Sequence, residues 1–78
     1  MLKELLNAMV MGLVEDKTAI KIEVDSVNEE GITVYHLNVA PDDMGRVIGK
    51  QGKIAKAIRT IMRSGAVRVN EKVMVEID

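Results

Sequence analysis

The residues best placed to do chemistry form one short segment, Val47-Ile48-Gly49-Lys50-Gln51-Gly52-Lys53. Its two glycines, three residues apart, permit a tight turn and let a ligand backbone approach without obstruction by a Cβ atom. A helix is predicted to begin directly after Gly52, so its first free N–H groups and the positive end of its dipole would point into the loop. An anion is the natural occupant of such a position, and Lys50 and Lys53 add positive charge beside the amide of Gln51. The segment therefore predicts an anion-binding loop.

The spacing of the glycines excludes the common nucleotide-binding loops. A Walker loop needs a glycine five residues before its Gly-Lys-Ser/Thr, but Val47 stands in that place and Ile54 follows Lys53. The dinucleotide-binding fingerprint G-x-G-x-x-G follows a strand, whereas this loop follows a predicted helix. We therefore do not expect a nucleoside triphosphate or a dinucleotide as the ligand.

Positive charge is concentrated around the same loop. The formal net charge is −1, from 11 basic and 12 acidic residues. No acidic residue lies between positions 44 and 70, whereas seven basic residues do: Arg46, Lys50, Lys53, Lys56, Arg59, Arg63 and Arg68. A local positive field matters more for binding a polyanion than the total charge does. We expect one electropositive surface; the simpler alternative is a solvated helix face that happens to be basic.

Periodicity predicts a helix and a hairpin ahead of the loop. Residues 20–25 alternate strictly and predict a strand, and residues 28–31 predict a turn that leads into a second, antiparallel strand. Before them lies the apolar stripe of an amphipathic helix, which should end near Glu15 and Asp16 and consists of Leu2, Leu5, Leu6, Met9, Val10 and Leu13.

The second strand of the hairpin has a mixed pattern. Ile32 and Val34 have the opposite parity to Leu37 and Val39. Either a bulge lies near residues 35–36, or the strand is central and partly buries both of its faces.

After the hairpin, Pro41 stops the strand, and Asp42 or Asp43 can cap a short helix that continues to about Ile48. A longer helix follows the glycine loop. It ends either at Gly65, with residues 67–69 forming a hairpin strand, or at Asn70, which tolerates a left-handed C-cap. We prefer Asn70, because the polar side of the helix continues in register beyond the loop as far as Arg63.

Residues 72–77 close the chain as a strand with Val73, Val75 and Ile77 facing inward. The predicted fold is therefore α+β, in the order α-β-β-α-α-β, with a three-stranded sheet and the helices packed on one face. Residues 1–78 make a single domain. The chain has no cysteine and one histidine, so we expect no disulfide, no metal site and no cofactor. We read His36 as structural, since no second ligand stands at metal-binding spacing.

Residues 40–59, Ala-Pro-Asp-Asp-Met-Gly-Arg-Val-Ile-Gly-Lys-Gln-Gly-Lys-Ile-Ala-Lys-Ala-Ile-Arg, resemble the KH family. The Gly-x-x-Gly loop of that family clamps the backbone of about four nucleotides of single-stranded nucleic acid. The order of elements is similar to the type II arrangement found in bacteria, and the chain resembles the small stand-alone bacterial KH proteins of the KhpA family over nearly its whole length.

The resemblance implies a division of labour among twelve residues. Phosphates would be held by Gly49, Lys50, Gln51 and Gly52. An apolar groove for bases would be lined by Val47, Ile48, Ile54 and Ala55. Charge along the path of the strand would come from Arg46, Lys53, Lys56 and Arg59. Core packing is the alternative role for the first three apolar residues, and solubility is the alternative for Arg59. The family often has a large aliphatic residue at the position of Ala55, so base preference does not carry over.

The resemblance implies a non-catalytic protein that binds single-stranded RNA in post-transcriptional regulation or as an RNA chaperone. It also implies a homodimer that pairs with a larger KH protein of the Jag type. The absence of cysteine suits a reducing cytoplasm, and no apolar stretch predicts a membrane contact. The dimer edge could use Ile61, Met62 and Ala66, for which core packing is an equal alternative. A second hypothesis is a KH-fold interaction or dimerisation module whose RNA binding is incidental. An enzyme is not expected, because the adjacent pair Asp42 and Asp43 is typical of a helix start.

Overall fold

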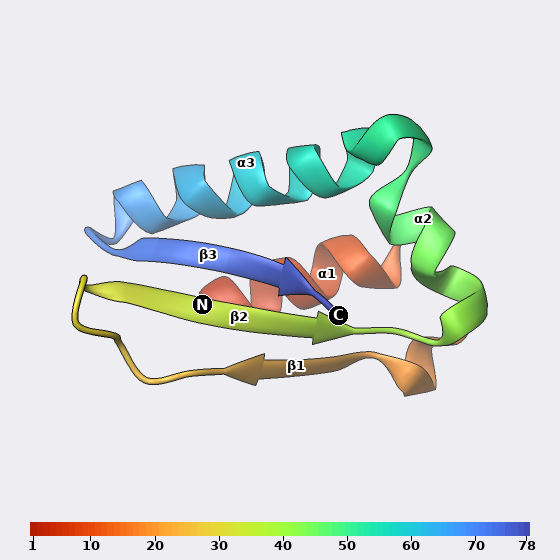
Figure 1. The fold of residues 1–78 in the computed structure, drawn as a ribbon, viewed down its shortest axis with the longest axis horizontal. Helices are drawn as coiled ribbons and strands as arrows, with labels where there is room; N and C mark the ends of the chain where they lie inside the picture. The colour runs from red at the N-terminus through yellow and green to blue at the C-terminus, as the bar shows by residue number, and fades with distance from the viewer.

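The computed structural model describes all residues from 1 to 78. Its elements follow the predicted order and form an α+β fold (Figure 1). Their bounds are Leu2–Met11 for α1, Lys21–Val24 for β1, Ile32–Asn38 for β2, Met44–Ile48 for α2, Lys53–Arg68 for α3 and Lys72–Ile77 for β3. No helix is long and apolar enough to span a bilayer.

The three strands form one mixed sheet in the order β1-β2-β3. β1 is antiparallel to β2, which confirms the predicted hairpin, and β3 is parallel to β2. Parallel neighbours need a crossover connection, which α2 and α3 supply. In Figure 1, α1 lies behind the strands and α3 runs along β3. Both helices contribute to a single core on one face of the sheet, as predicted.

β2 is the central strand, and this position explains its mixed pattern. Each residue of β3 pairs with one residue of β2, so no bulge interrupts the ladder. Thr33, Tyr35 and Leu37 face the helices and are buried, whereas Ile32 and Val34 are half-buried on the other face. The second of the two predicted alternatives is therefore confirmed.

α3 continues through Gly65 and ends at Arg68, and Asn70 takes a left-handed φ of 58° just beyond it. The preferred prediction for this helix is confirmed. A Cβ atom on Gly65 would lie 3.1 Å from Cδ2 of Leu2 and 3.2 Å from Cδ2 of Leu5. Glycine at this position therefore lets α1 approach α3 closely.

Two of the three residues considered for a dimer edge on α3 belong to the core. Met62 and Ala66 are fully buried, whereas Ile61 is 46% exposed. The alternative role in core packing is confirmed for Met62 and Ala66. Of the three residues only Ile61 lies at the surface, where Val67 of the same helix is still more exposed.

The predicted end of α1 was wrong, because the helix stops at Met11 and not near Glu15 and Asp16. The backbone N–H groups of Glu15 and Asp16 donate to Oδ1 and Oδ2 of Asp43 at 3.2 and 3.0 Å. A carboxylate from a distant turn thus takes the donors that a longer helix would have used. Val14 remains buried after the helix has ended, so the apolar pattern outlasts the helix.

The predicted capping role of Asp43 was also wrong. No side chain caps α2, and Asp42 is exposed. Asp43 is buried and joins the α1–β1 connection to the start of α2, and Nε of Arg46 lies 3.2 Å from its Oδ1. The hydrogen bonds from the N–H groups of Asp16 and Glu15 lower the pKa of Asp43 below its ordinary value.

Replacing Asp43 with asparagine should lower the melting temperature at neutral pH by about 10 °C, because an amide has one acceptor oxygen for two N–H groups. The folded pKa of Asp43 is lowered, so its contribution to stability is present above the ordinary aspartate pKa. It is lost as the pH falls through the folded pKa. Circular dichroism melts from neutral to strongly acidic pH should therefore show a shallower acid decline for the variant. The exposed Asp42→Asn serves as control, and equal melting temperatures for both variants would contradict this role.

Candidate nucleic-acid interface

The glycine loop is a tight turn with an unusual backbone. Gly49 has φ 76° and ψ 175°, Gln51 has φ 57°, and Gly52 has φ 75° and ψ 14°. The N–H of Gly49 donates to the carbonyl of Gly45 at 2.9 Å, which closes α2, and the N–H of Gly52 donates to the carbonyl of Gly49 at 3.2 Å. A non-glycine residue in the left-handed region is costly, and such strain is often found at functional sites.

Gly49 is required by close packing as well as by its backbone angles. A Cβ atom at this position would lie 2.5 Å from Cγ1 of Ile54, a distance no real contact allows. Ile54 thus packs directly against the loop from the first turn of α3. Gly52 has open space around it, and its left-handed angles alone favour glycine.

The start of α3, where the sequence predicts an anion-binding position, carries no negative side chain of its own. No side chain caps it, and its first turn contains no acidic residue. Lys50, Gln51 and Lys53 are exposed around it. None of the three lysines Lys50, Lys53 and Lys56 takes part in an ion pair, so their charges face solvent.

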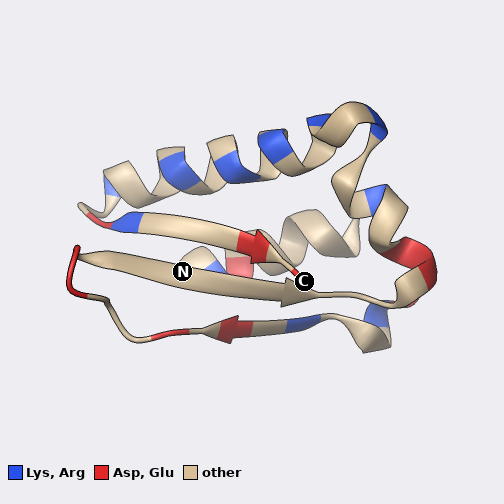
Figure 2. Ribbon diagram, in the orientation of Figure 1, with Lys and Arg blue, Asp and Glu red and all other residues tan.

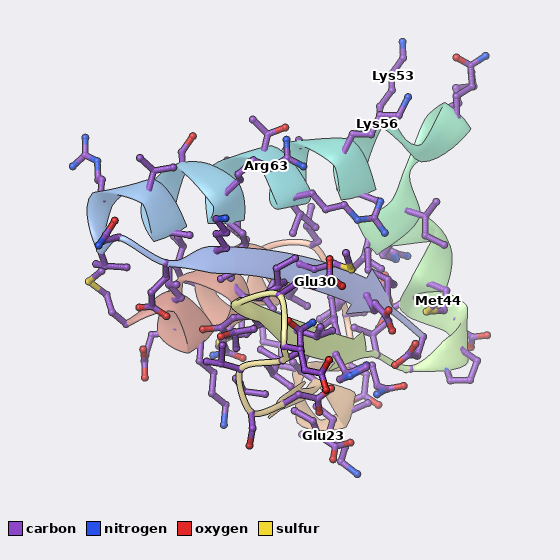
Figure 3. The ribbon with its side chains drawn as sticks, turned by 60° about the vertical axis from the view of Figure 1, so that its left-hand side comes forward. Glu23, Glu30, Met44, Lys53, Lys56 and Arg63 are labelled. Carbon is purple, nitrogen blue, oxygen red and sulfur yellow. The ribbon has the colours of Figure 1, made fainter.

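The predicted separation of charge exists in space. Figure 2 shows basic residues along α3 and at the loop with no acidic residue among them, whereas the acidic residues lie on other segments, including β1, the β1–β2 connection, the turn before α2 and the end of β3. Lys53 and Lys56 point outward from the start of α3, and Glu23 lies on the far side of the molecule (Figure 3). One surface of the protein is therefore electropositive despite the net charge of −1.

The two predicted arginines are less free than the lysines. Arg46 lies with Nη2 3.0 Å from Oε1 of Glu15 and also contacts Asp43, so its charge is largely balanced. Nε of Arg59 donates to the backbone carbonyl of Val75 at 3.1 Å. This bond satisfies part of the free edge of β3 and holds the guanidinium between α3 and the sheet.

The four predicted apolar residues divide into two pairs. Val47 is fully buried in the core and Ala55 is 5% exposed, so neither presents surface beside the loop. For Val47 the alternative role in the core is the one that the structure shows. Ile48 is 39% exposed and Ile54 is half-buried, and these two side chains form the accessible apolar surface at the loop.

A small groove between α3 and β3 was not predicted from the sequence. It encloses about 100 Å³ and is lined by Arg59, Arg63, Val73, Met74 and Val75. Met74 is 48% exposed, which gives the groove an apolar wall next to two arginines. The outward parity of Met74 in its strand was the only available signal, because the pairing that places β3 beside α3 is not encoded in a local pattern.

A Gly-x-x-Gly loop between two helices, on a three-stranded sheet of this order, defines a KH domain. Residues 3–77 match the sequence model of the family described as KhpA/KhpB, KH domain. The chain belongs to this KhpA/KhpB family of KH domains. It is 46% identical over 76 residues to the RNA-binding protein KhpA of Clostridium acetobutylicum, covering 97% of this chain and 99% of that protein. It is 37% identical over 76 residues to the RNA-binding protein KhpA of Aquifex aeolicus, covering 97% and 94%.

The fold also resembles part of a larger solved protein. Aquifex aeolicus Era, solved with GDP and aluminium fluoride, superposes with a TM-score of 0.68 over 97% of this chain at 19% identity. A structure of Era in complex with MgGDPNP and nucleotides 1506–1542 of 16S ribosomal RNA gives the same TM-score. This chain spans less than a third of Era, 29% and 28% in the two cases, so the likeness concerns the fold of one portion.

Proposed function

We propose that this protein binds single-stranded RNA without catalysing a reaction, and that the loop at residues 49–52 holds the RNA backbone. One observation carries the proposal. The loop leads into an uncapped helix start that is surrounded by the exposed lysines Lys50, Lys53 and Lys56, none of them in an ion pair. Relatives that match 97% of the chain and are named RNA-binding proteins support RNA binding.

The roles of the site residues follow from their exposure. Loop amides and Lys50 contact phosphates, and Gln51 offers an uncharged partner. Ile48 and the accessible part of Ile54 contact bases, whereas Val47 and Ala55 support that surface from beneath.

Charged residues extend the proposed path away from the loop. Lys53 and Lys56 continue the positive charge along α3, and Arg59 and Arg63 border the groove beside Met74. Arg46 lies at the edge of the proposed RNA-binding surface. It would contribute its charge by breaking its ion pair with Glu15 and binding a phosphate instead. Backbone contacts of this kind give broad sequence tolerance and a strong dependence on salt.

The same proposal includes the cellular setting. We infer a cytoplasmic homodimer that acts in post-transcriptional regulation or as an RNA chaperone and pairs with a Jag-type KH protein. A single small domain contacts few nucleotides, so a second copy raises avidity without new contacts. Ile61 and Val67, 46% and 72% exposed on α3, are the apolar side chains available for such pairing. They also favour the second candidate function, an interaction module whose RNA binding is incidental.

Charge reversal along α3 distinguishes the two functions. A Lys53→Glu, Lys56→Glu variant and the wild type are titrated with a fluorescent single-stranded RNA of mixed sequence over a range of salt concentrations. We expect weaker binding and a salt slope that is shallower by about 1.4, because each lost phosphate contact on a single strand contributes about 0.7.

The control is Lys3→Glu, Lys21→Glu, which changes the net charge equally at exposed positions on α1 and β1. It should bind nearly as the wild type does. If both double variants have the same affinity and slope, α3 does not contact RNA, and the interaction module becomes the better account.

A further inference from the structure

The open face of the sheet carries a cluster of ionisable side chains around the only histidine of the chain. His36 lies on the central strand, β2, and is opposite Glu76 of β3 in the pairing register. Its Nδ1 lies 3.4 Å from Oε2 of Glu76 and 3.5 Å from Oδ2 of Asp78. Its Nε2 lies 2.8 Å from Oδ2 of Asp25, which follows β1. Carboxylates from the segment after β1 and from the end of the chain therefore meet at one imidazole on β2.

The backbone holds these groups in place. The N–H of Asp78 donates to the carbonyl of Leu37 at 3.0 Å and so continues the ladder between β2 and β3 beyond the last strand residue. The side chain of His36 is 27% exposed, while those of Glu76 and Asp78 are each 50% exposed. The ring is thus fixed on a rigid strand, and the carboxylates leave room for water on their outer side.

The separations fit a metal ion. One donor atom from each of His36, Glu76 and Asp78 lies within 4.8 Å of the other two. Metal–ligand distances of about 2.0–2.2 Å place two donors of a tetrahedral site roughly 3.4 Å apart. The imidazole nitrogen is already 3.4 and 3.5 Å from the two carboxylate oxygens. A bound ion would need only small side-chain movements, and water would complete its coordination.

The donor set also indicates which ion would bind. One imidazole nitrogen with two carboxylate oxygens suits borderline divalent ions such as Zn²⁺, whereas Mg²⁺ and Ca²⁺ prefer sites made of oxygen alone. A histidine that binds a metal usually donates its other ring N–H to a carboxylate, which fixes the tautomer and the orientation of the ring. Asp25 is in that position at Nε2, outside the three-residue set.

We propose that His36, Glu76 and Asp78 bind a divalent transition-metal ion of the Zn²⁺ class on the sheet face that the helices leave open. The ion would link the centre of β2 to the end of β3 and stabilise the folded chain. No local pattern in the sequence indicates this site, because Glu76 and Asp78 stand 40 and 42 residues after His36 and become its neighbours only through the parallel pairing. The site is independent of the glycine loop.

The test is a titration of the folded protein with zinc chloride, followed by calorimetry and thermal unfolding. The hydrogen bond with Asp25 raises the pKa of His36, so a proton competes with the ion, and about pH 8 is the suitable condition. We expect one ion per chain and a melting temperature several degrees higher at saturating Zn²⁺. In nitrogen-15 NMR spectra, the His36 Nδ1 signal should shift on addition of the ion.

Matched variants make the test specific. His36→Gln and the pair Glu76→Gln, Asp78→Asn should each lose the thermal shift and most of the heat. The pair Glu29→Gln, Glu30→Gln removes the same charge from the exposed turn and should behave as the wild type. The proposal is overturned if Zn²⁺ up to millimolar concentration leaves the wild type unchanged. It is equally overturned if His36→Gln responds as the wild type does, since the ion would then bind elsewhere.

Discussion

Replacing Gly49 with alanine is expected to destabilise the protein by roughly 3–5 kcal/mol, the sum of a forbidden backbone conformation and a steric overlap. The angles φ 76° and ψ 175° belong to a region that is essentially limited to glycine. The new Cβ would also lie within 2.9 Å of three side-chain atoms of Ile54, the nearest at 2.5 Å. A domain of this size has a total stability of about 4–12 kcal/mol, so the expected loss is a large part of that stability. Urea denaturation followed by circular dichroism measures the loss.

Gly52→Ala is the matched control for this prediction. Gly52 has a left-handed φ of 75°, but no atom lies within 4 Å of the added Cβ. The expected cost is about 1–2 kcal/mol from the backbone alone. Adding Ile54→Ala to Gly49→Ala should recover part of the stability relative to the sum of the single variants, because the overlapping atoms are removed. If the two glycine variants lose the same free energy of unfolding and Ile54→Ala recovers none of it, the contact with Ile54 is not the reason that position 49 requires glycine.

The double variant Lys50→Asp, Gln51→Asp is expected to weaken binding to single-stranded RNA by about 100-fold or more at low salt. It changes the loop by three charge units at the place where phosphates are proposed to lie. It also places two carboxylates at the positive end of α3, where they would occupy the N–H groups that an RNA phosphate needs. Fluorescence anisotropy with a short labelled RNA measures the change.

The fold of this variant should survive. Both positions are exposed, and aspartate tolerates the left-handed angles of Gln51 better than most residues do. Lys3→Glu, Ala8→Glu changes the net charge by the same three units at exposed positions of α1 and is the matched control. A folded loop variant that binds as tightly as this control would remove the loop from the interface.

The parts of the fold that could be predicted are those that a local sequence pattern determines. The six elements and their order followed from apolar periodicity and from Pro41. The continuation of α3 past Gly65 followed from its helical register. The central position of β2 was one of two interpretations of its mixed parity, and only the pairing with β3 distinguished it from a bulge.

The errors occurred where a partner from another segment decides the outcome. α1 ends early because the carboxylate of Asp43 binds the amides of Glu15 and Asp16, and no pattern within the helix contains that information. The same bonds explain why Asp43 does not cap α2.

The candidate RNA-binding site was likewise predictable only in part. Residue types identified the loop and its lysines, since glycine spacing and charge are properties of one segment. Exposure was not predictable, because Val47 and Ile48 are neighbours of similar character, and only the packing of α2 buries the first and leaves the second 39% exposed. The groove beside Met74 could not be predicted without knowing the order of the strands in the sheet.

The most direct test of RNA binding through the glycine loop is a ¹H–¹⁵N NMR titration of the wild type with a single-stranded RNA of about six nucleotides. We predict that the largest shifts occur at residues 49–53 and decline along α3 towards Arg63, with smaller shifts at Met74. The acidic β1–β2 connection, residues 25–31, should be unaffected. Shifts centred on Ile61 and Val67 or on the open face of the sheet, with the loop unchanged, would contradict the proposed interface.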